Sequence, residues 1–295
     1  MTGRPLTVRD WVLFTERRLI ASRVGFGHGT WDARDEAAWL VSAALRIPPQ
    51  TLGAHLSERL SGRAQARARA LLRSRIRTRA PLSYLVREAW FAGLSFFVDP
   101  RVIVPRSLIG EFLRAGDPPV LAPSGITRIL DLCTGSGAIA IAAARLWPGA
   151  RVDAADISPE ALAVAARNVR RHRLGHRVRL IRSDLFAALS GERYDLILSN
   201  PPYVAEDELA DLPREFQWEP RLALAAGPEG LDCVLPILTR AARHLTDTGR
   251  LVLEVGGARA ALESHYPEAP LLWLASNDDE CVGYWHKEDL AAFGA

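Results

Sequence analysis

Apolar residues recur at helical spacing in the first part of the chain. Trp11 and Phe14 share one face of a predicted helix that also carries Arg18. This spacing is typical of helices that bury one side. A second stripe is formed by Ala37, Leu40, Val41 and Ala44.

Prolines set the ends of these predicted helices. Pro48 and Pro49 stop the second helix, and a third should run from about Ser57 to Arg79, because Pro81 follows it. No cluster of β-branched residues interrupts this part. Residues 1–88 are therefore expected to form a small helical domain.

The pattern changes over residues 89–104, which are aromatic and β-branched, with Asp99 and Pro100 between two runs. This predicts a β-hairpin. A loop rich in proline and glycine follows at residues 117–125. We interpret residues 89–125 as a hairpin and linker.

From residue 126 onward, predicted strands and helices alternate, which is typical of an α/β fold with a parallel, doubly wound sheet covered by helices on both faces. This domain should span residues 126–295. The expected strands cover residues 128–132, 151–155, 177–181, 194–199, 250–255, 271–275 and 281–286, and the expected helices cover residues 138–146, 159–172, 231–246 and 257–264.

Composition adds few restrictions. The chain has 295 residues, of which 48% are hydrophobic and 24% charged, an ordinary globular balance. No apolar run approaches a membrane span and no leader pattern opens the chain, so a cytoplasmic protein without membrane contact is expected. Cys133, Cys233 and Cys281 lack disulfide or zinc spacing, and no metal site is expected.

Charge is concentrated in one place. Eight arginines and no acid lie between Arg59 and Arg79. Such a segment is either a solvated helix face or an electrostatic contact for RNA. Both interpretations stay open at this point.

The first chemical motif is RILDLCTGSGAIAIA, in which a buried strand ends at Asp131. The spacing of Asp131, Cys133, Gly135 and Gly137 differs from the dinucleotide-binding pattern. The two glycines would allow a ligand to approach the backbone closely, although they could also serve a tight turn.

Acids end the next two strands. Asp156 can accept hydrogen bonds from both hydroxyls of a ribose, because Ser158 and Pro159 are sufficient to start the following helix. Asp184 can accept from an exocyclic amine such as that of adenine, with Leu185 and Phe186 as apolar surface for the ring.

A glycine loop, a ribose acid and an adenine acid in this order resemble the class I S-adenosylmethionine-dependent methyltransferases. The resemblance implies that S-adenosylmethionine is the cofactor. The residues expected to bind it are Asp131, Cys133, Thr134, Gly135, Gly137, Asp156, Ile157, Asp184, Leu185 and Asn200.

The fourth strand ends in SNPPY, which resembles the motif of methyltransferases that act on planar amide or amino nitrogens. The side-chain oxygen of Asn200 and the carbonyl of Pro201 can accept the two N–H groups of a target amide. Pro201 and Pro202 would fix this geometry before binding, and Tyr203 would pack against the planar target. The four residues are the expected catalytic residues.

Further segments, VPRSLIGE after the hairpin and EPRLALAAGPEGLD after SNPPYV, are similar to the protein-glutamine methyltransferases. Within that family the chain resembles the PrmB branch, whose substrate is the third large-subunit ribosomal protein. The resemblance implies that the helical domain recognises this protein and that Arg59–Arg79 could contact ribosomal RNA. Cys133 and Leu108 depart from the family pattern, where glycine and proline are usual.

Two charged residues complete the expected substrate site with Asn200, Pro201 and Tyr203. Glu111 could orient the substrate or form an ion pair with Arg106. Glu219 and Pro220 could support the Asn200 loop, as the same motif does in the family.

Three other functions remain open. A release-factor glutamine methyltransferase would use the same chemistry on a different protein. A nucleic-acid adenine methyltransferase would have to flip its base out and would usually carry a DNA-reading domain. A non-catalytic assembly factor would not need an intact Asn200-Pro201-Pro202-Tyr203 motif.

Overall fold

The computed structural model describes residues 7–115, 125–276 and 281–294. The chain divides into two compact units, of which the first comprises Met1–Glu88 and Pro213–Trp218 and the second comprises Ala89–Leu212 and Glu219–Ala295. The loop expected over residues 117–125 lies outside the described residues except for its last position. The six residues 213–218 are far from the rest of the first unit in the sequence.

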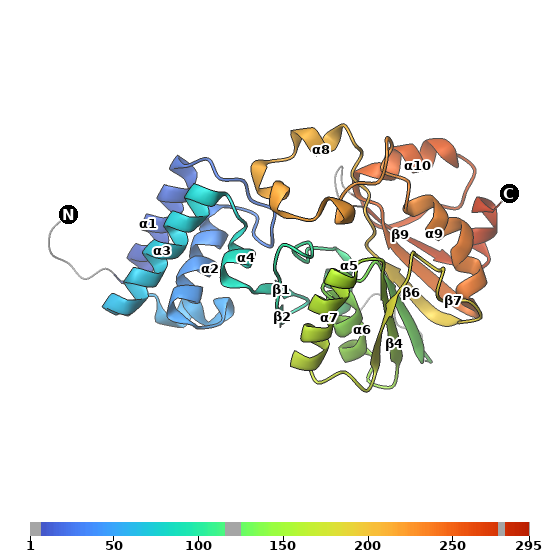
Figure 1. The fold of residues 1–295 in the computed structure, drawn as a ribbon, viewed down its shortest axis with the longest axis horizontal. Coiled ribbons are helices and arrows are strands. Elements are labelled where there is room, and N and C mark those ends of the chain that lie inside the picture. The colour runs from blue at the N-terminus through green and yellow to red at the C-terminus, as the bar shows by residue number, and fades with distance from the viewer. Residues whose placement is uncertain (1–6, 116–124, 277–280, 295) are drawn as a thin grey trace. The chain divides into compact units, whose positions relative to one another are not determined.

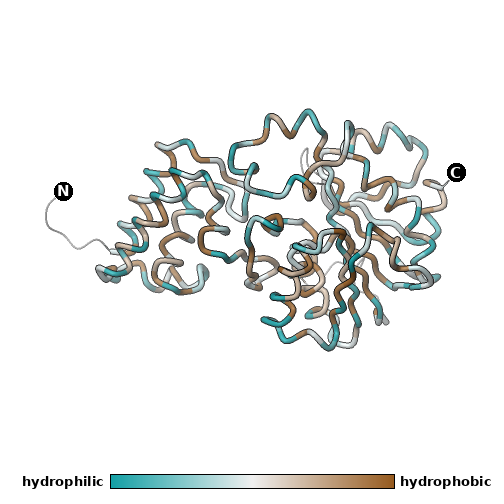
Figure 2. The backbone as a smooth tube through the Cα atoms, viewed as in Figure 1, coloured by the Kyte–Doolittle hydropathy of each residue, from teal (hydrophilic) through white to brown (hydrophobic). Residues whose placement is uncertain are grey.

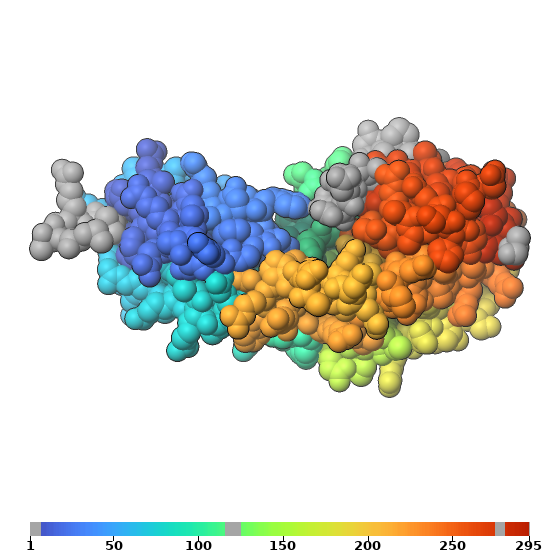
Figure 3. Space-filling view, turned by 90° about the horizontal axis from the view of Figure 1, so that it is seen from above, coloured from blue at the N-terminus to red at the C-terminus, as the bar shows by residue number. Residues whose placement is uncertain are grey.

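Helices α1, α2 and α3 pack against one another in the first unit (Figure 1). Figure 3 shows the atoms of this part of the chain, in blue and cyan, as a closely packed group. Their starts follow from side-chain caps. Thr7 and Asp10 form a capping box on α1, and Asp32 accepts from two backbone N–H groups at the start of α2. The elements are α1 (Val8–Ala21), α2 (Ala33–Leu45), the 3₁₀ segment η1 (Pro49–His55), α3 (Gly62–Thr78) and α4 (Leu82–Val86).

The third helix begins later than the sequence pattern predicted. Ser61 caps α3 by accepting from the N–H of Ala64, and the residues before it form the separate 3₁₀ segment η1 and a turn. The expected start at Ser57 is therefore wrong, because the residues between Ser57 and Ser61 form a turn, a bend and the bridge from Arg59 to Thr7, and the cap at Ser61 sets the start of α3.

A buried polar network joins the distant segment Pro213–Trp218 to the helices of the first unit. Arg75 is only 1% exposed, and its guanidinium donates to Glu36 at 2.7 Å and to Glu215 at 3.2 Å. Glu215 also accepts from the N–H of Gly25 at 2.9 Å and from Arg79 at 3.2 Å. Two carboxylates are thus compensated by two guanidinium groups inside the helical unit.

The second unit begins with a short hairpin of β1 (Ala89–Phe91) and β2 (Leu94–Phe96). Its turn is formed by Ala92 and Gly93, both of which have positive φ, as two-residue hairpin loops require. The turn expected at Asp99 and Pro100 is therefore wrong. Asp99 instead accepts from the backbone and side chain of Arg101 in an isolated turn.

A seven-stranded sheet in the order β5-β4-β3-β6-β7-β9-β8 organises the second unit. Neighbouring strands from β5 to β7 are parallel, whereas β9 is antiparallel to both β7 and β8. The predicted parallel sheet is thus correct except at this edge. The strands are β3 (Arg128–Leu132), β4 (Arg151–Asp156), β5 (Val178–Arg182), β6 (Tyr194–Ser199), β7 (Leu245–Glu254), β8 (Leu272–Ser276) and β9 (Cys281–His286).

Helices cover both faces of this sheet. The apolar side of α6 packs on one face together with Phe96 of the hairpin, and α9 packs on the other face with Phe293. Figure 2 shows hydrophobic residues along the strands between these layers. The helices are α5 (Ile109–Ala115), α6 (Ala138–Leu146), α7 (Pro159–Arg171), α8 (Glu208–Asp211), α9 (Val234–Ala241) and α10 (Arg259–His265), with 3₁₀ segments at Arg214–Trp218, Arg221–Ala223, Ala242–His244, Gly256–Ala258 and Asp289–Phe293.

The described ranges contain neither a membrane-spanning helix nor a cluster of metal-binding side chains. No helix there is long and apolar enough to cross a membrane. No group of three or more histidine, cysteine, aspartate or glutamate side chains there could hold a metal ion.

Candidate active site

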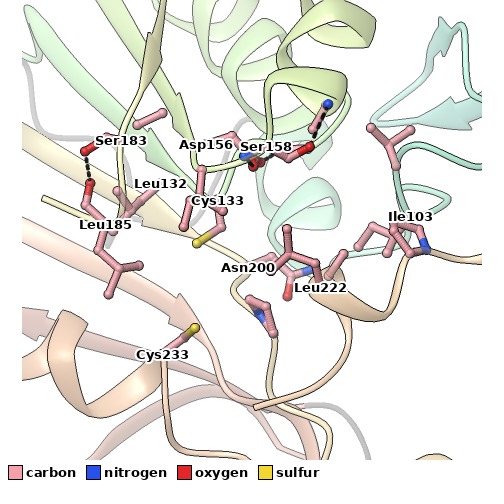
Figure 4. Close-up of a pocket in the computed structure, with 18 of the residues that line it drawn as sticks. Ile103, Leu132, Cys133, Asp156, Ser158, Ser183, Leu185, Asn200, Leu222 and Cys233 are labelled. Carbon is pink, nitrogen blue, oxygen red and sulfur yellow. Dashed lines mark hydrogen bonds between the residues drawn. The ribbon is translucent and has the colours of Figure 1, made fainter. Parts of the chain in front are cut away.

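A cavity lies at the carboxyl ends of the parallel strands, where open α/β sheets bind ligands. It is built entirely from the second unit. The predicted site residues that line it are Cys133, Gly135, Asp156, Ile157, Asp184, Leu185, Asn200 and Pro202. Figure 4 shows several of their side chains around the common space.

Asp131, Thr134 and Gly137 belong to the glycine loop but do not line the cavity. Asp131 is fully buried and its Oδ2 accepts from Thr134 Oγ1 at 2.5 Å and from the N–H of Ala140 at 2.9 Å. Burial raises the pKa of Asp131 to about 7. The hydrogen bonds of Asp131 therefore join the end of β3 to the glycine loop and to the start of α6, and direct contact of these residues with a cofactor stays a prediction.

Gly137 shows why the loop needs a glycine at its end. Its φ is +79°, and a Cβ there would lie 3.3 Å from the Cβ of Ala165 on α7. A side chain would therefore combine backbone strain with a close contact between α6 and α7.

Cys133 has a φ of 61°, a conformation that costs a residue with a side chain roughly 1–3 kcal/mol. Its thiol and that of Cys233 face the same cavity (Figure 4). Burial raises the pKa of both thiols. Both cysteines therefore stay protonated near neutral pH and act as apolar lining rather than as nucleophiles.

Asp156 lies at the end of β4, and its side chain already accepts hydrogen bonds from the backbone. Its Oδ2 accepts from the N–H of Gly135 at 2.8 Å, and its Oδ1 accepts from the N–H of Ser158 at 2.9 Å. Ser158 caps α7 through Ala161, as expected. Burial raises the pKa of Asp156 although these hydrogen bonds lower it. A carboxylate has about four acceptor positions, so Asp156 can still accept from a ligand in the cavity.

Asp184 and Leu185 follow β5 and line the cavity. Ser183 fixes this turn, because its hydroxyl donates to the carbonyl of Leu185 at 2.6 Å and accepts from the N–H of Ala188 at 3.0 Å. Phe186, which we expected beside the adenine ring, is instead buried and stacks on His244 at 4.5 Å. The sequence could not distinguish it from Leu185, since both are apolar and adjacent.

The corner after β6, residues 200–203, contains a buried polar atom without a partner in the described part of the chain. Asn200 Oδ1 is buried and has no hydrogen-bond partner within the described residues. Asn200 and Pro202 line the cavity, but Pro201 and Tyr203 do not. The ring of Tyr203 packs against the hydrophobic core instead, and its hydroxyl donates to Glu254 at 3.1 Å. The role of Tyr203 as a stacking surface for the target therefore stays a prediction, because its side chain packs on the core and does not line the cavity.

Arg106 and Glu111 do not line the cavity and do not pair with each other. Arg106 binds both oxygens of Glu219, at 2.6 and 2.8 Å, and Glu219 also accepts from the N–H of Val104. Glu111 is exposed and pairs with Arg114 at 3.2 Å. The expected Arg106–Glu111 ion pair is wrong. Arg106 pairs with Glu219 instead, because a buried carboxylate without a cation would be costly, whereas the exposed Glu111 is solvated by water.

Comparisons with known proteins agree with this geometry. The model of the methyltransferase small domain matches residues 120–229. A ribosomal protein uL3 glutamine methyltransferase from Bradyrhizobium diazoefficiens is 45% identical over 96% of this chain and 91% of its own length. Proteins of the same name from Bordetella pertussis and Burkholderia pseudomallei are 45% and 43% identical, over 94% and 97% of this chain and 94% and 96% of their own lengths.

The chain belongs to the ribosomal protein uL3 glutamine methyltransferase family. The resemblance to protein-glutamine methyltransferases and the class I methyltransferase fold predicted from the sequence are therefore confirmed.

Some residues of this family member's cavity were missed by the sequence interpretation. Val102 and Ile103 line it from the linker, and Leu222 lines it after Pro220. Their apolar character gives no functional signal by itself. Leu222 is 59% exposed, which is high for a leucine. This exposure beside a cavity is visible only in the structure.

Proposed function

We propose that the protein transfers a methyl group from S-adenosylmethionine to the side-chain amide nitrogen of a glutamine in ribosomal protein uL3. The observation that carries this proposal is the buried Oδ1 of Asn200, which has no partner within the described residues. An unsatisfied buried acceptor costs about 1–3 kcal/mol. A glutamine N–H donated to Asn200 would remove that cost.

The cavity residues suit the cofactor. Asp156 would accept from the ribose hydroxyls, and Asp184 and Leu185 would contact the adenine. Gly135 leaves free space beside the backbone for the cofactor, since a Cβ built there would contact nothing within 4 Å. When bound, S-adenosylmethionine supplies an electrophilic methyl group on a positively charged sulfur.

The protein's own contribution is to orient a poor nucleophile. Asn200 Oδ1 and the carbonyl of Pro201 would each accept one N–H of the glutamine amide. The nitrogen's electron pair then forms the new N–C bond while the S–C bond breaks and its electrons remain on sulfur. The amide nitrogen loses one proton to solvent. Acceptors held in place stabilise the positive charge that develops on nitrogen.

Incubation of the purified protein with S-adenosylmethionine and purified uL3, followed by peptide mass spectrometry, tests the proposal. We expect one added methyl group on a glutamine of uL3. Asn200→Ala should lower the rate by about 10²–10³-fold, the usual loss for one charge-stabilising group, while uL3 binding is retained. An equal loss of uL3 binding would contradict the catalytic role of Asn200.

The same experiment distinguishes the competing functions. Purified release factor replaces uL3 in a second reaction, and an adenine-containing DNA duplex replaces it in a third. Methylation of the release factor or of the DNA, with uL3 unmodified, would reject our proposal. Binding of uL3 without any transfer would favour a non-catalytic assembly factor.

We propose further that the helical domain, residues 1–88, recognises uL3 and that α3 contacts ribosomal RNA, in the cytoplasm where ribosomes assemble. Four of the arginines from Arg59 to Arg79 have partners within the helical unit. Arg67 donates to the carbonyl of Ala44, Arg69 lies 5.4 Å from the centroid of the Trp11 ring, and Arg75 and Arg79 bind Glu215. The other arginines on α3 are exposed and project within about 80° of its circumference: Arg63, Arg73 and Arg77.

Salt dependence tests the RNA contact. The triple variant Arg63→Gln/Arg73→Gln/Arg77→Gln should bind an rRNA fragment more weakly, and its plot of log K against log salt should be less steep by about 2–3 units. Methylation of free uL3 should remain unchanged, because the cavity is unaltered. An unchanged slope would assign these arginines to a solvated helix face.

A further inference from the structure

Three neighbouring residues, Glu254, Gly256 and Gly230, restrict the position of Tyr203. Its hydroxyl donates to Glu254 Oε1 at 3.1 Å. A Cβ on Gly256 would lie 2.2 Å from a carbon of the Tyr203 ring, and a Cβ on Gly230 would lie 2.3 Å from its carbonyl oxygen. Both glycines have positive φ, of +47° and +72°. Any larger residue at either position would push Tyr203 out of place.

Glu254 ends β7 and is 5% exposed. Besides the bond from Tyr203, its Oε2 accepts from Ser107 Oγ at 2.5 Å and from the N–H of Leu108 at 3.1 Å. One carboxylate therefore joins three segments: the end of the fifth parallel strand, the corner after β6 and the linker before α5. Burial raises its pKa, and the hydrogen bonds from Ser107, Tyr203 and Leu108 oppose that effect.

The corner depends on such support. The catalytic acceptor Asn200 Oδ1 makes no hydrogen bond within the described chain that could fix its direction. Pro201 and Pro202 have restricted φ angles, so the backbone between Asn200 and Tyr203 has few ways to adjust when Tyr203 moves. An error of about 1 Å at a reacting group can lower a rate by about 10²-fold.

We infer that Glu254 is a positioning residue for methyl transfer, which acts through the Tyr203 hydroxyl to hold the Asn200–Pro201 acceptors at the reacting nitrogen. This inference rests on the function proposed above. Glu254 does not line the cavity and is not expected to contact either substrate.

A double-mutant cycle on the full-length protein, with uL3 as substrate, tests the inference. Glu254→Met removes the acceptors at similar volume, and Tyr203→Phe removes only the hydroxyl. Each should lower kcat by about 10–100-fold, while KM for S-adenosylmethionine stays within about threefold. The double variant should be no worse than the worse single variant. Effects that multiply would show that Glu254 does not act through Tyr203 and would overturn the inference.

Two further variants separate positioning from general destabilisation. Glu254→Gln should recover most of kcat, because its amide can accept from Ser107 and Leu108 and donate to the Tyr203 oxygen. Ser107→Ala removes a different bond to the same carboxylate and should leave kcat within about threefold. Equal losses of kcat in Ser107→Ala and Glu254→Met would overturn the inference.

The outcomes also separate this inference from the proposed function. If the wild-type protein fails to methylate uL3, the proposed function fails. If the wild type is active and Tyr203→Phe keeps the full kcat, only the positioning role fails. The second result remains decisive even if Glu254→Met does not fold, because Tyr203→Phe leaves the core intact.

Discussion

The helical unit and the cavity region of the second unit bury carboxylates in different surroundings. In the helical unit, Glu36 and Glu215 lie against the guanidinium groups of Arg75 and Arg79. Around the cavity of the other unit, the donors to Asp131, Asp156 and Glu254 among the described residues are all neutral: hydroxyls and backbone N–H groups. Asp153 and Glu219, which belong to the second unit but do not line the cavity, are buried and pair with arginine as in the helical unit.

The pKa values follow part of this contrast. Burial acts to raise the pKa of Glu215, but hydrogen bonds from the backbone and from Arg75 outweigh it and leave the pKa below its ordinary value. Burial still raises the pKa of Glu36, despite Arg75. Burial also raises the pKa of Asp131, Asp156 and Glu254, to which no arginine donates. Of these three carboxylates, Asp156 lines the cavity and can reach a ligand there, whereas Asp131 and Glu254 are buried behind its lining.

The largest expected effect comes from breaking the paired region. Arg75→Met should lower the free energy of unfolding of the helical unit by about 3–5 kcal/mol, because Glu36 and Glu215 would stay buried without their cation. Urea unfolding followed by tryptophan fluorescence measures this. Arg73→Met, on the same helix but exposed, is the matched control and should change stability by less than about 0.5 kcal/mol. Equal effects of the two variants would contradict the structural role of the network.

The next effect concerns a site carboxylate and depends on pH. Because the folded-state pKa of Asp131 is raised from 3.8 to about 7, the folded protein retains a proton that the unfolded chain releases. Stability should fall as pH rises through that window. Asp131→Asn lacks the titration, so its stability relative to wild type should improve between pH 4 and pH 8 by at most about 4 kcal/mol.

Thermal unfolding of both proteins at several pH values measures this difference. Asparagine can still accept from Thr134 and Ala140 through its amide oxygen, so the comparison isolates the charge. A stability difference that is independent of pH would mean that Asp131 stays ionised in the folded protein.

A smaller effect should appear in ligand affinity. In Asp156→Asn, one amide oxygen replaces two carboxylate oxygens that already accept from Gly135 and Ser158. We expect affinity for S-adenosylmethionine to fall by about 10–100-fold, as for the loss of a charged hydrogen bond. Isothermal titration calorimetry measures it, and a stability loss without any change in affinity would place Asp156 with the structural carboxylates.

The smallest effect is expected for an exposed carboxylate, which is neither buried against arginine nor buried near the cavity. Glu111 is exposed and pairs only with Arg114 among the described residues. Glu111→Gln should change stability by less than about 0.5 kcal/mol and leave methylation of uL3 unaffected. A large loss of activity would restore the substrate role that the sequence suggested for Glu111.

Local sequence patterns predicted much of this molecule. The strand ends that carry Asp156, Asp184 and Asn200 are set by apolar runs and punctuating polar residues, and the structure brings all three to one cavity. The reversed direction of β9 could not be predicted, because direction depends on the rest of the sheet. The hairpin turn at Ala92 and Gly93 was overlooked in favour of Asp99 and Pro100, although Gly93 is itself a turn signal.

Hydrogen-bond partners that lie far apart in the sequence were the main feature that the sequence did not predict. Arg75 and Glu215 are separated by 140 residues, and Tyr203 and Glu254 by 51. A surplus of arginine without acids was visible in the sequence, but nothing local identified Glu215 as its complement. The side-chain direction of Tyr203 likewise depends on the space left by Gly256, which no periodicity encodes.

The assignment of Pro213–Trp218 to the helical unit has a consequence for recombination. A chimera that exchanges only residues 1–88 between relatives would import a new arginine pair but keep the resident hexapeptide. Domain swaps in this family should therefore carry both pieces of the chain, and natural lineages should inherit them together although a long stretch of gene separates their codons.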